Sequence, residues 1–297
     1  MSRAFETHWP EYLIEAALLG MFMLAACAAV CLFEHPSSVI RRRFPSGRLR
    51  RTMVGILMGL TGIALIYSPL GQRSGAHMNP ATTLTFLALG KIGMWDAVFY
   101  VLAQFVGGLA GVGLAGLVLR GIVDHPAVRF VITVPGQAGV RGQLAAWAGE
   151  FAIAFLMMGM VLVSANHMGT SPYTGLFAGF LLAMYIAIEA PLSGMSLNPA
   201  RTLASAIAAR EFRGLWIYFT APPLAMLAAA GVYASVEGRL GVYCAKLCHP
   251  NHGDCMFECR INHMGHPTDG VDSQPSGRIG IQRVSTSESG DKSETRR

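Results

Sequence analysis

Apolar residues gather into long stretches over roughly the first 237 residues of the chain, separated by shorter polar segments. A helix needs roughly 20 apolar residues to cross a hydrocarbon core of about 30 Å. The pattern therefore predicts an all-α membrane protein with six transmembrane helices. They are expected at about 11–33, 52–70, 94–119, 144–164, 172–189 and 214–236.

Two further apolar runs, at about 79–88 and 198–209, are too short to cross. Each opens with the same tripeptide, in which Asn fits a helix N-cap and Pro fits the first helical position. About ten residues of helix reach only half-way across the hydrocarbon core. We therefore expect two half-helices, which point to a pathway at the membrane midplane. The two motifs are Asn79-Pro80-Ala81 and Asn198-Pro199-Ala200.

The chain reads as three spans and one half-span, twice over. The two halves cover about 11–120 and 144–237. Glu15 and Glu150 occupy corresponding places in the first span of each half. This correspondence predicts an inverted repeat with a pseudo-two-fold relation between the halves.

Small residues recur four positions apart within three of the predicted spans. Such spacing lets helices approach closely in lipid, where no hydrophobic drive brings them together. We expect tight helix pairs at these positions. The pairs are Gly55 with Gly59, Gly107 with Gly111 and Gly175 with Gly179.

Composition supports a membrane protein over a soluble one. The chain is 53% hydrophobic and 13% charged, whereas soluble domains carry about 25% charged residues. The formal charge of +6 is spread over loops and tail. Because no basic patch is interleaved with aromatic residues, we expect no nucleic-acid partner.

The two Asn-Pro-Ala motifs, each behind Ser-Gly and the second followed directly by Arg201, resemble those of the aquaporin, or major intrinsic protein, family. The resemblance covers about residues 11–237. It implies a passive multi-pass channel for water in the cell membrane, with no catalytic step and no cofactor for channel function. It also implies a homotetramer with one pore per subunit and both termini in the cytoplasm.

Capping chemistry is compatible with the pore that the resemblance implies. Each half-helix presents about half a positive charge at its N-terminus, so two ends that meet form a barrier to cations, hydronium included. The side-chain oxygens of Asn79 and Asn198 can cap their helices, which leaves each NH2 group to donate to water. We expect the residues before each Asn, 75–78 and 194–197, to be extended and to line the pore with carbonyl groups. His77 fits the family's histidine near one pore mouth.

A selectivity filter is carried over from the family by spacing. Arg201 would donate to the solute and repel cations, because a lone arginine in an apolar region faces water or a partner. Its companions would be Met195, Ile186 and Met58, with Gly59 as the alternative to Met58. Such a filter is apolar apart from Arg201 and could admit small neutral solutes such as glycerol.

Other positions are similar to water channels rather than glycerol facilitators. Glycerol-conducting members of the family typically place Asp directly after the arginine and a basic residue four positions further on. Thr202 and Ala206 stand at these positions here. The aromatic pair Tyr218-Phe219 is also similar to the water-channel pattern.

The two intramembrane glutamates allow a rival interpretation. Carboxylates within spans can form proton relays, so Glu15 and Glu150 could serve a proton-coupled transporter of small solutes. In the resembled family, however, such glutamates accept hydrogen bonds from the half-helix loops. A further alternative is a membrane-anchored metal-binding or redox-sensing module with a vestigial pore.

The distribution of arginines among the loops does not agree with the membrane orientation that the resemblance implies. The loops after the first and third spans carry more arginines than the loops on the other side, for example at 41–43 and at Arg120, Arg129 and Arg141. The positive-inside rule alone would place these loops in the cytoplasm. We follow the family and expect cytoplasmic termini.

A Cys/His-rich segment at 238–266 follows the channel-like part. Cys244, Cys248, Cys255 and Cys259 form two Cys-x3-Cys pairs, and spacing of four places each pair on one face if the segment is helical. The cysteines, with the interspersed His249, His252, His263 and His266, could bind zinc or another soft metal. Two disulfides or unpaired thiols remain open. Residues 1–10 are expected to form an N-terminal tail, and residues 267–297 a disordered polar tail.

Overall fold

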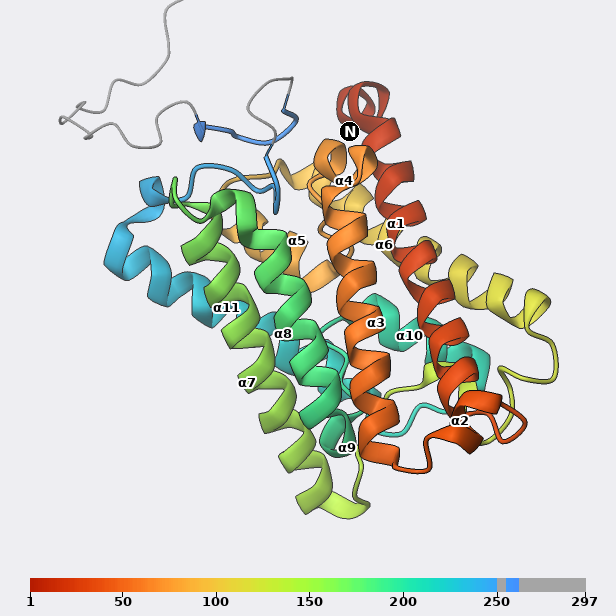
Figure 1. The fold of residues 1–297 in the computed structure, drawn as a ribbon. Helices are drawn as coiled ribbons and strands as arrows, with labels where there is room; N and C mark the ends of the chain where they lie inside the picture. The colour runs from red at the N-terminus through yellow and green to blue at the C-terminus, as the bar shows by residue number, and fades with distance from the viewer. Residues whose placement is uncertain (250–254, 262–297) are drawn as a thin grey trace, which may run out of the picture. The chain divides into compact units, whose positions relative to one another are not determined.

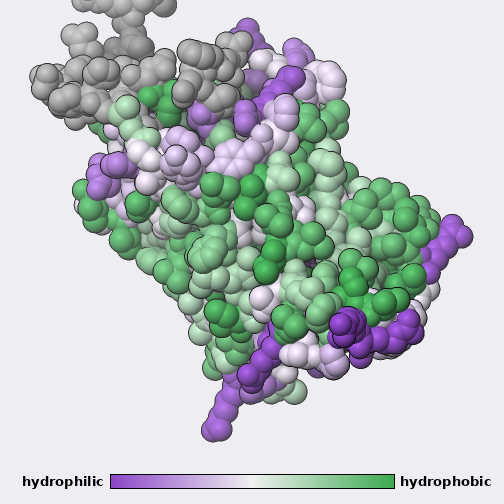
Figure 2. Space-filling view, viewed as in Figure 1, coloured by the Kyte–Doolittle hydropathy of each residue, from purple (hydrophilic) through white to green (hydrophobic). Residues whose placement is uncertain are grey.

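Helices make up most of the computed structural model, which describes residues 1–249 and 255–261 (Figure 1). Within these residues, six helical segments are long and apolar enough to cross a membrane, as predicted. In Figure 2, apolar residues gather over the middle of the visible face and hydrophilic residues lie towards its two ends. The spanning helices are α1 (Ser2–Glu34), α3 (Gly47–Tyr67), α6 (Met94–Val118), α7 (Gly139–Ala165), α8 (Thr174–Ile188) and α11 (Leu215–Glu237).

The two predicted half-helices are α5 (Pro80–Ala88) and α10 (Pro199–Ala209). Each begins with the proline of its motif and is capped by the preceding asparagine. The loop before α5 enters from the face at which the N-terminus lies, called here the terminal face. The loop before α10 enters from the opposite face (Figure 1).

Glycine pairs hold the spanning helices together, as their spacing predicts. A Cβ atom on Gly107 of α6 would lie 2.1 Å from the carbonyl oxygen of Ala16 in α1. Between α3 and α8, a Cβ atom on Gly59 would lie 2.5 Å from the carbonyl oxygen of Gly179. Any side chain at these positions would push the helices apart, so the close approach requires glycine.

Several short helices were not anticipated by the hydrophobic pattern. Ser38 and Ser68 accept hydrogen bonds from the first turns of α2 and α4, respectively. The short helices α4 and α9 (Ala190–Ser193) end at glycines in the left-handed region, Gly75 with φ +88° and Gly194 with φ +85°. The first helix begins at Ser2, so most of the expected tail at 1–10 is helical. The short elements are α2 (Val39–Arg43), α4 (Pro69–Ser74), α9 (Ala190–Ser193), η1 (Arg129–Val131), η2 (Ser171–Tyr173) and η3 (Arg239–Gly241).

The described part of the Cys/His-rich segment packs onto the channel helices at the terminal face. Residues 242–249 and 255–261, called here the C-terminal cap, contain almost no helix. Val242, Ala245 and Phe257 are almost completely buried. The remaining histidines of this segment, His252, His263 and His266, and the predicted polar tail at 267–297 lie outside the described residues.

Candidate functional site

Both motif asparagines cap their half-helices as predicted. The side-chain oxygen of Asn79 accepts a hydrogen bond from the Ala81 N–H at 2.9 Å. That of Asn198 accepts from the Ala200 N–H at 3.0 Å and the Arg201 N–H at 3.2 Å. These bonds satisfy N–H groups that a helix N-terminus leaves unpaired.

The two asparagines also connect the two halves of the molecule. Asn79 Nδ2 donates to the Leu197 carbonyl at 2.8 Å, and Asn198 Nδ2 donates to the Met78 carbonyl at 2.7 Å. Each amide thus bonds the residue that precedes the other asparagine. The expectation that the NH2 groups are wholly available to water is wrong, because one hydrogen of each is used in this cross-link. The second hydrogen of each amide remains.

The loops before the asparagines are non-helical. The prediction that they are extended is wrong. Alternate residues adopt the left-handed region, with φ +54° at Ala76 and +48° at Met78, and +53° at Met195 and +61° at Leu197. Successive N–H groups in such a conformation can point to one side and form a nest for an anion. Both nests hold a glutamate.

Glu15 of α1 holds the first loop. Its carboxylate, completely buried, accepts hydrogen bonds from Ser74 Oγ at 2.8 Å, the His77 N–H at 3.1 Å and the Met78 N–H at 2.7 Å. Gln104 Nε2 of α6 donates to the same carboxylate at 2.8 Å. The first three contacts brace the loop, and the fourth joins the carboxylate to α6.

Glu150 of α7 holds the second loop in the same way. It is also completely buried. Ser193 Oγ donates to it at 2.7 Å, the Ser196 N–H at 2.6 Å and the Leu197 N–H at 2.8 Å. Glu15 and Glu150 therefore have corresponding hydrogen-bond partners in the two halves, as their corresponding places in the sequence predict.

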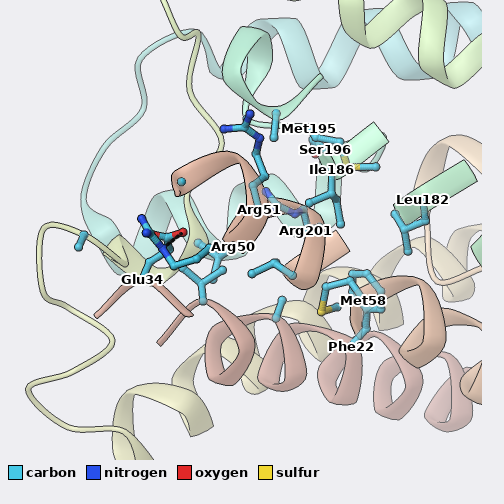
Figure 3. Close-up of a pocket in the computed structure, with 18 residues that line it drawn as sticks. Phe22, Glu34, Arg50, Arg51, Met58, Leu182, Ile186, Met195, Ser196 and Arg201 are labelled. Carbon is cyan, nitrogen blue, oxygen red and sulfur yellow. Dashed lines mark hydrogen bonds and ion pairs between the residues drawn. The ribbon is translucent and has the colours of Figure 1, made fainter. Parts of the chain in front are cut away.

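The four predicted filter residues surround one cavity of about 500 Å³ on the opposite face (Figure 3). Met58, Ile186, Met195 and Arg201 all line it. The alternative, Gly59, instead packs against Gly179 of α8. The four side chains chosen by spacing therefore lie around one cavity, with Met58 rather than Gly59 facing it.

Arg201 also borders a second cavity, of about 140 Å³, that reaches the asparagines. Asn79 and Asn198 line this second cavity. Arg201 is 9% exposed, and its Nη1 has no hydrogen-bond partner among the described residues. A buried guanidinium nitrogen with unused donors can bind a polar solute that passes.

His77 lies at the terminal-face end of the second cavity, which it lines. It does not face open solvent, since it is 3% exposed. Its Nδ1 is 3.0 Å from Thr83 Oγ1, and its Nε2 is 2.9 Å from the Ala245 carbonyl oxygen of the C-terminal cap. The imidazole stacks between Phe86 and Phe257, with ring centroids 5.2 and 5.4 Å away.

The C-terminal cap brings together four side chains of types that can bind a metal ion. The ligand atoms of Cys244, His249, Cys255 and Cys259 all lie within 4.8 Å of one another. Cys248, which the Cys-x3-Cys spacing assigns to this group, is not part of it. The reason is that residues 242–249 are not helical, so positions four apart do not share a face.

Several residues at the site were missed by the sequence argument. Phe22 and Leu182 line both cavities, but apolar residues within spans carry no signal that distinguishes pore from lipid. From the C-terminal cap, Leu247 lines the second cavity, and Phe257 stacks on His77, which also lines it. The sequence offered one indication of their burial, since each is a large apolar residue that stands between two cysteines.

Comparison with known proteins gives a consistent result. Residues 5–233 match the family model described as Major intrinsic protein. The chain is 35% identical over 228 residues to Aquaporin NIP1-1 of Arabidopsis thaliana, covering 75% of this chain and 72% of that protein. It is 31% identical over 225 residues to Nodulin-26 of Glycine max, covering 75% and 76%.

A solved structure shares the fold. The X-ray structure of the aquaglyceroporin from Plasmodium falciparum matches with a TM-score of 0.66 over 79% of this chain and 98% of that chain. The sequence identity is 18%, so this similarity concerns the arrangement of helices alone.

Proposed function

Since the chain belongs to the major intrinsic protein family, we propose that it is a passive channel for water that also admits small neutral solutes such as glycerol and excludes protons and ions. The observation that carries the proposal is the pair of cross-linked asparagine amides, which line one cavity together with Arg201. Conduction through such a pore involves no catalytic step and needs no cofactor.

Proton exclusion follows from the ends of the two half-helices. α5 and α10 direct their positive N-termini to the same region, where Asn79 and Asn198 bond to the opposite loops. Two partial positive charges there disfavour hydronium and other cations. The remaining amide hydrogens can donate to a water oxygen, which holds that water as an acceptor.

Solute selection is proposed to occur in the larger cavity. Arg201 supplies donors there, and the side chains of Met58, Ile186 and Met195 supply apolar walls. An apolar lining removes water from the carbon skeleton of glycerol at little free-energy cost. The guanidinium of Arg201 can form hydrogen bonds with the glycerol hydroxyl groups. We therefore propose that glycerol enters in addition to water.

The hydrogen bonds of the two glutamates favour a channel over a proton-coupled transporter. Among the described residues, the hydrogen-bond partners of Glu15 and Glu150 belong to the segments before the half-helices, apart from Gln104. A relay carboxylate needs a route to a second proton-accepting group. We propose a positioning role for both residues instead.

Two family properties extend the proposal. We propose a multi-pass protein of the cell membrane with cytoplasmic termini, against the arginine count, and a homotetramer. Protease access to the termini in intact cells tests the orientation, and light scattering of the detergent-purified protein tests the assembly. External cleavage of both termini, or a monomer, would contradict these proposals.

Proteoliposomes test the channel itself. Osmotic swelling that has a low activation energy and ignores an imposed pH gradient supports a channel. Solute uptake that follows the pH gradient would instead indicate a coupled transporter and overturn the proposal.

A further inference from the structure

The C-terminal cap covers the terminal-face end of the proposed pore. Leu247 lines the cavity that contains Asn79 and Asn198. It also lines a separate pocket of about 260 Å³ on the outer side, together with Cys244 and His249. Leu247 therefore stands between the pore interior and the pocket beside the cysteine cluster.

The first cap segment is anchored to the pore loop by hydrogen bonds. The Leu247 N–H donates to the Gly75 carbonyl at 3.1 Å. The Ala245 carbonyl lies 2.9 Å from His77 Nε2. The Tyr243 N–H donates to Asn166 Oδ1 at 2.7 Å. These contacts place Leu247 directly over the loop that leads to the first half-helix.

The second cap segment covers the same loop from its other side. Phe257 stacks on His77, and a Cβ atom on Gly75 would lie 2.9 Å from the Phe257 ring. The Glu258 N–H donates to the Lys91 carbonyl at 3.1 Å. Tyr100 Oη lies 3.0 Å from Met256 Sδ. The two cap segments thus close over one mouth together.

The cysteine cluster joins these two segments. Cys244 and His249 belong to the first segment, and Cys255 and Cys259 to the second. The Cys244 and Cys255 sulfurs are 3.6 Å apart, and Cys259 Sγ is 3.2 Å from His249 Nε2. Ligands about 2.0–2.3 Å from a tetrahedral Zn²⁺ ion are about 3.3–3.8 Å from one another. These two separations are close to the tetrahedral values, and all four ligand atoms lie within 4.8 Å of one another.

The electrostatic surroundings suit a thiolate site. A Zn²⁺ ion with three thiolates and a neutral histidine carries one net negative charge. Lys91 and Lys246 are both buried, at 6% and 5% exposure. Lys91 interacts electrostatically with Cys244 and Cys259, and Lys246 with Cys255. Two buried ammonium groups can balance the charge of the site.

We propose that Cys244, His249, Cys255 and Cys259 bind one soft, tetrahedral divalent cation of the Zn²⁺ class, and that the bound ion holds the C-terminal cap closed over the pore. This inference rests on the proposed channel function. The ion cross-links the two cap segments through all four side chains, and its release removes this cross-link. Leu247 and Phe257 then leave the mouth, and water passes.

Metal content tests the site first. Zn²⁺ is titrated into the full-length protein after chelation, and bound metal is measured by mass spectrometry. We expect one ion per chain in the wild type and in the matched control Cys248→Ser, and none in Cys255→Ser. No binding by the wild type, equal loss in both variants, or a Cys244–Cys255 disulfide in the protein as purified would overturn the site.

Water flux tests the cap. Proteoliposomes with the full-length protein are compared with and without Zn²⁺ at equal protein content. A shift from about 99% closed to about 1% closed raises the flux by roughly two orders of magnitude, and we expect at least a tenfold rise on chelation. Cys255→Ser is expected to be open with or without Zn²⁺, and Cys248→Ser to respond as the wild type does.

Leu247→Ala separates the two proposals. Its smaller side chain should leave Zn²⁺ bound but raise the flux in the presence of the ion. Flux that is present but unaffected by Zn²⁺ in the wild type would overturn the cap and leave the channel standing. Flux no higher than that of empty vesicles in Leu247→Ala and in chelated wild type would overturn the channel as well.

Discussion

Replacing Glu150 by Gln tests whether this carboxylate braces the second pore loop. Ser193 Oγ and the Ser196 N–H both donate to Oε1, and the Leu197 N–H donates to Oε2. The Gln oxygen can keep the bonds at one position, but its NH2 group then faces the Leu197 N–H. The lost charge-assisted bond is worth about 1.5–3 kcal/mol, and the unpaired N–H about 1–3 kcal/mol more.

The lower end of this sum, about 2.5 kcal/mol, changes the equilibrium of the ordered loop by roughly sixtyfold. Leu197 also accepts the hydrogen bond from Asn79, so the asparagine cross-link loosens with the loop. We expect the water permeability per molecule of Glu150→Gln to fall at least about tenfold, without any new dependence on a pH gradient. Stopped-flow light scattering of metal-stripped proteoliposomes measures it.

Glu189→Gln is the matched control. Glu189 is 8% exposed and lies beside the same loop, and neither of its carboxylate oxygens has a hydrogen-bond partner among the described residues. The same chemical change there removes no bond, so permeability should stay within about twofold. Equal losses in both variants would show that charge, not bonding, matters, and unchanged Glu150→Gln would refute the bracing role.

Three further substitutions test other parts of the account. Arg201→Ala should admit larger polyols and weaken cation exclusion, and unchanged solute selectivity in swelling assays would contradict its place in the filter. Ile186→His should lower glycerol permeability relative to water permeability, because the added ring narrows the passage beside Ile186. An unchanged ratio of the two permeabilities would argue against Ile186 in the filter. Gly107→Ala should abolish folded, membrane-inserted protein, because its Cβ would lie 2.1 Å from the carbonyl oxygen of Ala16. Gly113→Ala on the same helix is the control, since a Cβ there meets nothing within 4 Å. Gel filtration measures the yield of both variants, and equal yields would refute the packing argument.

The fold was largely predictable because its determinants are local. Length and hydrophobicity locate the spanning helices, and Asn-Pro at 79–80 and 198–199 fixes where the half-helices begin. Glycines four residues apart mark the tight helix pairs. Short helices such as α4 escaped prediction because their caps and left-handed ends, such as Gly75, leave no hydrophobic period.

The candidate site was predictable only in part. Spacing was enough to choose side chains that lie around one cavity, because the half-helix start sets the register of Met195 and Arg201. The cross-link between Asn79 and Leu197 depends on the meeting of two halves far apart in sequence. The spacing of four residues placed Cys248 in the candidate metal-binding group, but Cys248 lies outside the cluster, because that spacing presumes a helix that the cap does not form.

The most direct test is the stopped-flow water permeability of proteoliposomes that contain the chelated full-length protein, measured at several temperatures and with a pH gradient imposed. If Asn79 and Asn198 meet at a continuous water path, permeability far exceeds that of empty vesicles, its activation energy is low and the pH gradient does not dissipate through the pore. Water permeability equal to that of empty vesicles, or a proton flux that accompanies it, would contradict the account.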